Sequence, residues 1–101
     1  MEIHEVAAAL SSDARAQFLL WLKDPETHLG QQYNGHLTPH GASLSLLSSK
    51  AGLSVSATSR HLERLLRVGF VRTTRVAPFT FYARDEDAIA AGFRVLDQVR
   101  R

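Results

Sequence analysis

Residues 44–82 constrain the fold most, because they contain two helical patterns, a very short turn and a hairpin pattern in succession. The turn at Gly52 has room only for a tight crossing of two helices, which is the helix-turn-helix arrangement. Ser54 has a side chain suited to begin the second helix, expected at 55–67. The sequence therefore predicts a helix-turn-helix over residues 43–67.

The second helix of this unit has two different faces. Thr58, Leu62 and Leu65 fall at spacings of four and three residues, which turns them toward a core. The opposite face carries Ser56, Ala57, Arg60, Arg64 and Arg67. A helix that presents arginines in this way fits the major groove of DNA.

A hairpin is expected directly after that helix. Gly69 stands where a left-handed residue ends a helix, and the β-branched and aromatic residues that follow favour strands at 70–75 and 79–83. The pair would form a wing over residues 70–83. Its tip, Val76-Ala77-Pro78, has neither glycine nor a basic residue, which weakens the case for deep insertion into a minor groove.

Positive charge is concentrated in one part of the chain. The 101 residues carry a net charge of only +2, whereas residues 60–84 hold six arginines and one glutamate, a local charge of +5. Such a cluster is an electrostatic footprint for phosphate. A solvated arginine face is the alternative interpretation of the charge alone.

The rest of the chain predicts further helices around this unit. We expect helices at 3–10, from the Ser12 cap to Lys23, at 43–50 and from Asp85 to 100, with a long loop at 25–42. At this length the chain is one domain, residues 1–101. The predicted fold is mainly α with a small β-hairpin wing, a winged helix-turn-helix in the order α-α-α-α-β-β-α.

Both terminal helices, 3–10 and 85–100, have apolar stripes that a small domain has little room to cover. Packing against a symmetry mate is the expected solution. The residues predicted for this dimer interface are Ile3, Val6, Leu10, Ile89, Phe93 and Leu96.

Composition excludes several classes of function. The chain has no cysteine, which removes disulfides, thiolate metal sites and thiol redox chemistry. It shows no signal peptide and no apolar run of membrane-spanning length, so we expect a cytoplasmic protein without a membrane partner. No nucleophile–base pair, paired catalytic carboxylates or phosphate-binding glycine loop is evident, and we expect no enzyme activity.

Five short motifs resemble the ArsR/SmtB family of winged-helix transcriptional repressors. They are Ala-Leu-Ser-Ser-Asp-Ala-Arg at 9–15, Trp-Leu-Lys-Asp-Pro-Glu at 21–26, Gly-Leu-Ser at 52–54, Thr-Ser-Arg-His-Leu at 58–62 and Phe-Tyr-Ala-Arg-Asp-Glu at 81–86. The resemblance covers nearly the whole chain apart from the loop at 27–42. It implies a dimer formed through the terminal helices and a recognition helix at 55–67.

The chain departs from this family at its metal sites. Ser43 and Ser45 stand where many members have a Cys-x-Cys pair, and hydroxyls are poor transition-metal ligands. No histidine follows His61, so the family's second site on the last helix is also missing. We therefore predict no metal, no cofactor, and either a small-molecule effector near the loop or no effector. The alternative is a metal-responsive loop built on His28, His36 and His40.

The leading hypothesis is a homodimeric repressor that binds a palindromic operator in double-stranded DNA. Arg60 is the best base reader, because arginine pairs bidentately with guanine. For Ser56, simple helix-start chemistry is the alternative role, and for His61 it is a structural hydrogen bond. A winged-helix module that binds another protein is the alternative function. The predicted DNA-binding residues are Ser54, Ser56, Ala57, Ser59, Arg60, His61, Arg64, Arg72 and Arg75.

Overall fold

The expected pair of crossed helices is present in the computed structural model, which describes residues 2–29 and 36–100. Helix α4 spans Leu44–Ala51 and helix α5 spans Val55–Arg67. Between them Gly52 has a left-handed φ of 69°, and its N–H donates to the carbonyls of Ser48 and Ser49. A side chain at this φ would be strained. Gly52 therefore ends α4 and turns the chain into α5.

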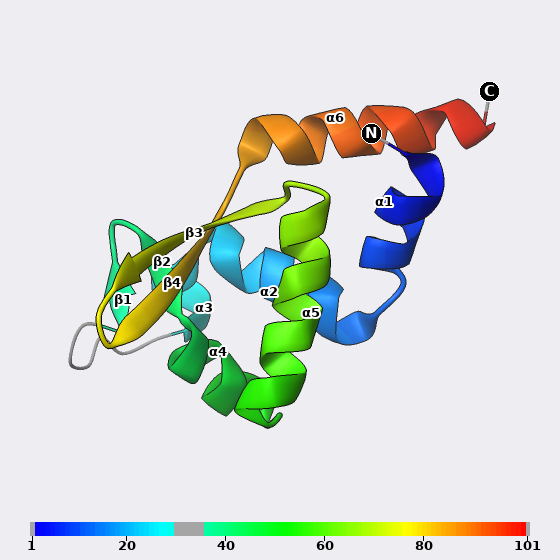
Figure 1. Ribbon diagram of the computed structural model, residues 1–101. Helices are drawn as coiled ribbons and strands as arrows, with labels where there is room; N and C mark the ends of the chain where they lie inside the picture. The colour runs from blue at the N-terminus through cyan, green and yellow to red at the C-terminus, as the bar shows by residue number, and fades with distance from the viewer. Residues whose placement is uncertain (1, 30–35, 101) are drawn as a thin grey trace.

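The two faces of α5 are as the sequence predicts. Thr58, Leu62 and Leu65 are fully buried, and the Ser54 hydroxyl accepts a hydrogen bond from the Ala57 N–H at 3.0 Å as an N-cap. At the other end Gly69, with φ of 81°, closes the helix. The buried face anchors α5, and the opposite face lies on the surface of the molecule (Figure 1).

The wing is a hairpin of two six-residue strands within a larger sheet. Strand β3 spans Val71–Val76 and β4 spans Phe79–Arg84. Strands β1, Leu37–Thr38, and β2, Gly41–Ser43, extend the antiparallel sheet in the order β1-β2-β4-β3. The wing is therefore supported along its inner strand, β4, by a second hairpin.

The prediction of an unstructured loop at 25–42 was wrong for the described part of that segment. A short helix, α3, spans Pro25–Leu29, with Pro25 at its first position, where a missing N–H costs nothing. Gly41, with φ of 107°, lets β2 approach β4 so closely that a Cβ there would lie 1.8 Å from the Tyr82 carbonyl oxygen. This pairing joins residues about forty positions apart, so no local pattern announces it. Residues 30–35 lie outside the described residues.

The remaining helices enclose the core. Helix α1 spans Ile3–Leu10, α2 spans Asp13–Lys23, and α6 spans Glu86–Asp97 and continues as a 3₁₀ turn, η1, at Gln98–Arg100. Helices α1 and α6 lie against each other, with both termini at the same end of the molecule (Figure 1). The largest fully buried side chains are Phe18, Phe70, Phe81, Leu47, Leu62 and Leu65.

Among the described residues, no helix has both the length and the apolar character needed to cross a membrane.

Candidate nucleic-acid interface

The outer face of α5 carries two arginines without a local partner. Arg60 and Arg64 are exposed, and within the described ranges neither makes a hydrogen bond or an ion pair. Arg67 differs, because it pairs with Glu63 of the same helix at 3.4 Å. The positive charge that α5 offers to a ligand therefore comes mainly from Arg60 and Arg64.

The first turn of α5 combines capping with exposure. The Ser54 hydroxyl is used by the Ala57 N–H, so its side chain has a structural role at the helix start. Ser56 is exposed, whereas Ala57 and Ser59 are half-buried. Ser56 is therefore the most accessible of these three side chains.

His61 is held by a residue that the sequence interpretation left without a role. Arg15, on α2, approaches the His61 Nδ1 to 2.9 Å through one guanidinium nitrogen. Its other nitrogens donate to the carbonyls of Ala9 at 2.8 Å and Ala8 at 3.0 Å, near the end of α1. Arg15 thus joins α1, α2 and α5. The structural hydrogen bond that the sequence analysis named as the alternative role of His61 is therefore present. The only sequence signal was the position of Arg15 within the motif at 9–15, which did not indicate a partner.

The environment of His61 disfavours its charged form. Burial lowers the pKa of His61 below its ordinary value of 6.5, and the positive charges of Arg15 and Arg60 lower it further. Burial also lowers the pKa of Arg15, with repulsion from Arg64 as the second cause. Several cationic groups are therefore crowded together on this side of α5.

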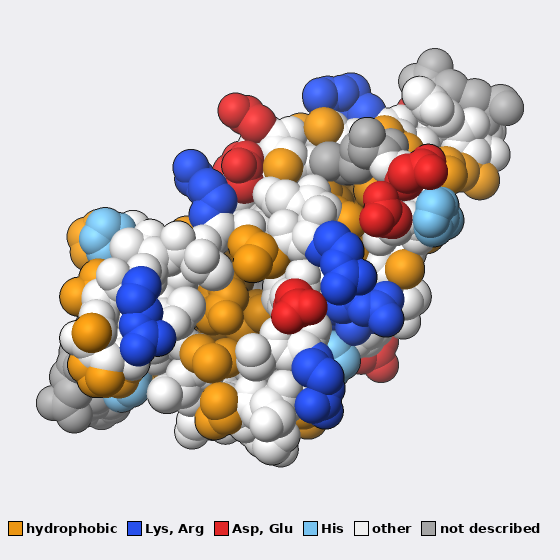
Figure 2. Space-filling model, viewed as in Figure 1, with side chains coloured by type: hydrophobic (Ala, Val, Ile, Leu, Met, Phe, Trp, Pro, Cys, Tyr) orange, Lys and Arg blue, Asp and Glu red, His pale blue; other side chains and the backbone are white. Residues whose placement is uncertain are grey.

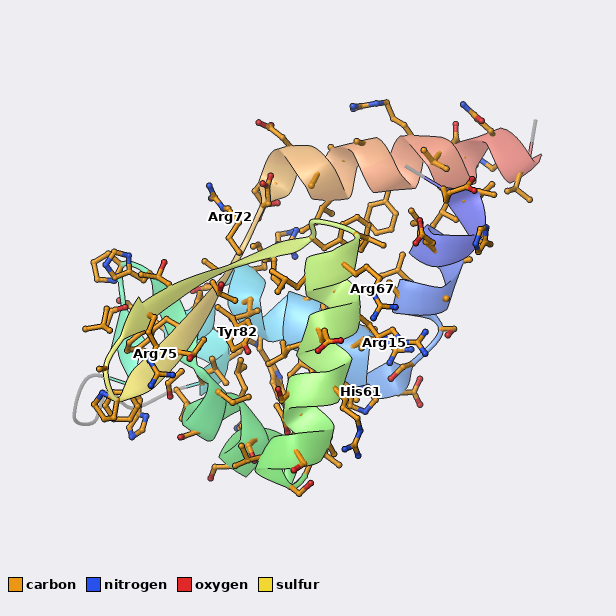
Figure 3. The ribbon with its side chains drawn as sticks, viewed as in Figure 1. Arg15, His61, Arg67, Arg72, Arg75 and Tyr82 are labelled. Carbon is orange, nitrogen blue, oxygen red and sulfur yellow. The ribbon has the colours of Figure 1, made fainter. Side chains whose placement is uncertain are left out.

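The wing arginines are each engaged with a neighbour. Arg72 lies 4.0 Å from the Asp85 carboxylate, and Arg75 donates to the Thr80 hydroxyl at 3.1 Å. Both are exposed. In Figure 3, Arg75 lies out on the wing, whereas Arg72 lies at its base near the start of α6. Val76, at the tip, is 49% exposed.

Figure 2 shows basic side chains in separate places, two of which lie on α5 and on the wing. One follows the side of α5, with a histidine beside the arginines, and the other is a single patch on the wing. Apolar side chains lie between them. Tyr82 of β4 lies in this intervening region (Figure 3), and burial raises the pKa of its phenol, with Glu63 as the second cause.

His36 and Ser43 have local structural roles. His36 bonds through Nδ1 to the Ser43 hydroxyl at 2.7 Å and packs edge-on against Phe79. The buried Ser43 also caps α4 by accepting from the Leu46 N–H. Within residues 2–29 and 36–100, no three histidine, cysteine, aspartate or glutamate side chains are grouped closely enough to hold a metal ion.

The predicted dimer residues divide into two groups. Val6 and Ile89 are 0% and 5% exposed in the single chain, so they belong to its core and offer almost no surface to a partner. Leu10 and Leu96 are half-buried. Ile3 and Phe93 are exposed by 38% and 51%, and Val99, which the sequence interpretation did not include, by 70%.

No protein-family model matches the chain. A curated relative does: the chain is 37% identical over 89 residues to YbzH, an HTH-type transcriptional regulator of Bacillus subtilis (strain 168) that is itself uncharacterized. The match covers 88% of this chain and 89% of YbzH. The chain belongs to the HTH-type transcriptional regulators.

Solved structures of other transcriptional regulators have a similar fold. HlyU from Vibrio cholerae N16961 matches with a TM-score of 0.61 and 28% identity, over 94% of this chain and 87% of that one. NolR from Sinorhizobium fredii matches with a TM-score of 0.59 and 25% identity, over 95% and 81%. A possible transcriptional regulator for arsenical resistance has a TM-score of 0.71 over 94% and 83%, and at 20% identity it supports the fold alone. The regulator is a winged helix-turn-helix protein.

Proposed function

We propose that this regulator is an ArsR/SmtB-type repressor that binds a palindromic operator as a homodimer. The observation that carries the proposal is the outer face of α5, where Arg60 and Arg64 project without a partner among residues 2–29 and 36–100, from a helix whose other face is fully buried. A helix held in this way can enter a major groove without losing contacts of its own. Two copies related by a two-fold axis would reach successive grooves about one helical turn apart.

The contacts follow from position on the helix. Arg60, near the start of α5, is the proposed base reader, with Ser56, Ala57 and Ser59 beside it. Arg64 and the wing residues Arg72 and Arg75 would meet phosphates, which set register but carry no sequence information. Ser54 contributes through the start of the helix that it caps.

Binding to labelled promoter DNA, followed by fluorescence anisotropy over a range of salt concentrations, tests the proposal. Because phosphate contacts release counterions, affinity must fall steeply as salt rises. Scrambled DNA of the same length serves as the control for sequence preference. Weak binding with no salt dependence would contradict the proposal and favour the alternative, a module that binds another protein.

The homodimer is proposed to form through exposed apolar residues of α1, α6 and η1. Ile3, Phe93 and Val99 offer the surface, while Val6 and Ile89 support it from the core. Phe93→Asp would place a charge in the interface and shift the chain to monomers in analytical ultracentrifugation at micromolar concentration. Asp87→Asn, an exposed change in the first turn of α6, is the control. A Phe93→Asp variant that stays dimeric would place the interface elsewhere.

We propose further that the input of the repressor is not a metal. The chain has no cysteine, and Ser43 is used as a buried helix cap rather than as a ligand. Calorimetric titration with zinc and with nickel tests this. Tight stoichiometric binding that is lost in His36→Ala or His40→Ala, and that weakens DNA binding, would make the segment after α3 a metal sensor.

A further inference from the structure

A basic cavity of about 320 Å³ lies on one side of α5. Its lining comes from α2 and α5 and consists of Arg15, Ala57, Arg60, His61 and Arg64. Three guanidinium groups and an imidazole thus surround one small space, and no acidic side chain of the described residues lines it. Figure 3 shows Arg15 and His61 side by side at this flank of the helix.

Arg15 determines which nitrogen of His61 carries the proton. Arginine is only a donor, so the His61 Nδ1 that it meets at 2.9 Å must accept. In the neutral imidazole the proton is therefore on Nε2, which leaves Nε2–H as a donor for another group. Because Arg15 is also bound to the carbonyls of Ala8 and Ala9, the ring is held from a rigid base.

The charges around His61 make the cavity receptive to an anion. Arg15 faces it from α2, and Arg60 and Arg64 line the same space from α5. From α1, Glu5 and His4 line a separate space together with Arg64 and Arg67. A bound oxyanion would relieve the repulsion that now disfavours protonated His61.

We propose that this cavity is a seat for one phosphodiester of the DNA backbone, held by Arg64 and by the His61 Nε2–H. Arg15 is a positioning residue that acts through His61, and Arg60 forms the wall nearest the groove. The inference rests on the proposed function, since a strand that flanks α5 in a major groove brings its phosphates to the sides of the helix. It adds a contact rooted in α2 to an interface otherwise made by α5 and the wing.

One consequence is that DNA binding takes up a proton. The second proton of His61 goes onto Nδ1, where it displaces the Arg15 N–H. The phosphate stabilises the charged imidazole that results, so the pKa of His61 is higher in the complex than in the free protein. Affinity for DNA therefore increases as the pH falls toward 6, and this part of the increase is lost in His61→Gln.

The first test uses the free protein and inorganic phosphate, so that it does not depend on DNA binding. The pKa of His61 is followed by the nitrogen chemical shifts of its imidazole during pH titrations in phosphate and in chloride at equal ionic strength. We expect phosphate to raise this pKa, and to raise it less in Arg64→Gln than in Arg94→Gln, an exposed arginine on α6 that serves as the control. An unchanged pKa would overturn the anion site.

The second test identifies the source of the phosphate. Operator duplexes carry one neutral methylphosphonate linkage at each position in turn, and each is bound by the wild type and by His61→Gln. At one linkage per half-site we expect about a tenfold loss for the wild type, the size of one charge-assisted hydrogen bond. At that linkage His61→Gln should add no further loss.

The outcomes separate the two proposals. If the losses of DNA affinity caused by the methylphosphonate and by His61→Gln are additive at every linkage, the cavity does not bind a DNA phosphate. This conclusion holds even if inorganic phosphate raises the pKa of His61. If the wild type binds no DNA, the proposed function fails, and the phosphate titration still decides whether the anion site exists. A further variant, Arg15→Lys, keeps the positive charge but cannot reach the Ala8 carbonyl, the Ala9 carbonyl and the His61 Nδ1 together. Thermal unfolding first checks that this variant is folded. Arg15→Lys should then weaken DNA binding to the same extent as His61→Gln.

Discussion

Helix α5 and the wing both carry arginines, but they hold them in different ways. On α5, Arg60 and Arg64 have no intramolecular partner among the described residues and converge with Arg15 and His61 on one cavity. On the wing, Arg72 is close to Asp85 and Arg75 is bonded to Thr80. The same residue type thus forms a concentrated site on the helix and isolated, partly satisfied contacts on the hairpin. The difference predicts that α5 supplies specificity, while the wing supplies affinity that is independent of sequence.

The largest effect is expected at Arg60. Arg60→Ala should cost about 1–3 kcal/mol of binding free energy for the operator and relax the preference at one base pair. The measurement is anisotropy against the operator and against single-base variants of it. An unchanged preference would move base reading to another residue and remove the contrast with the wing.

Arg75→Ala should have a smaller and more uniform effect. Because a phosphate contact carries no base information, affinity should fall to a similar extent for operator and scrambled DNA, and the salt slope should decrease by about one. Salt titrations on both duplexes measure this. A loss confined to the operator would show that the wing reads sequence as well.

Glu63→Gln tests the one acid on the outer face of α5. Its exposed pair with Arg67 is worth little to stability, so the free energy of unfolding should change by no more than about 0.5 kcal/mol. Removing the negative charge should tighten DNA binding by about two- to fivefold, as expected for one screened charge near a phosphate. Weaker binding in this variant would mean that Glu63 orients Arg67 for a contact.

The smallest expected effect is on the stability of the free protein as a function of pH. His61 has a folded pKa below 6.5, so the unfolded chain binds the proton more readily than the folded chain does. The stabilisation is complete above pH 6.5 and is lost as the pH falls toward the folded pKa. Thermal unfolding at pH 7.5 and 5.5 should therefore show a larger decrease in Tm for the wild type than for His61→Gln, and equal decreases would contradict the assigned direction.

Much of the fold was predictable, because its signals are local. The caps at Ser12 and Ser54, the turn at Gly52, the left-handed Gly69 and the start of the last helix at Asp85 each depend on interactions within about one helical turn, and they lie where the sequence predicts. In the structure Asp85 caps that last helix, and Gly52 is left-handed as well. The apolar periodicity of α5 likewise repeats within a single helix. The segment at 25–42 was misjudged because its strands depend on pairing with Tyr82 and Phe81, far along the chain.

Only the part of the candidate site that lies on α5 was predictable from the sequence. The amino-acid sequence by itself determined that α5 is amphipathic and that arginines occupy its outer face, since helical periodicity alone decides which residues share a face. Only the tertiary structure decided that Arg15 meets His61, 46 residues away, and that Val6 and Ile89 lie in the core rather than on the surface. The physical reason is that a hydrogen bond or a buried contact between two elements depends on how their faces pack, and no periodicity within either element records that packing.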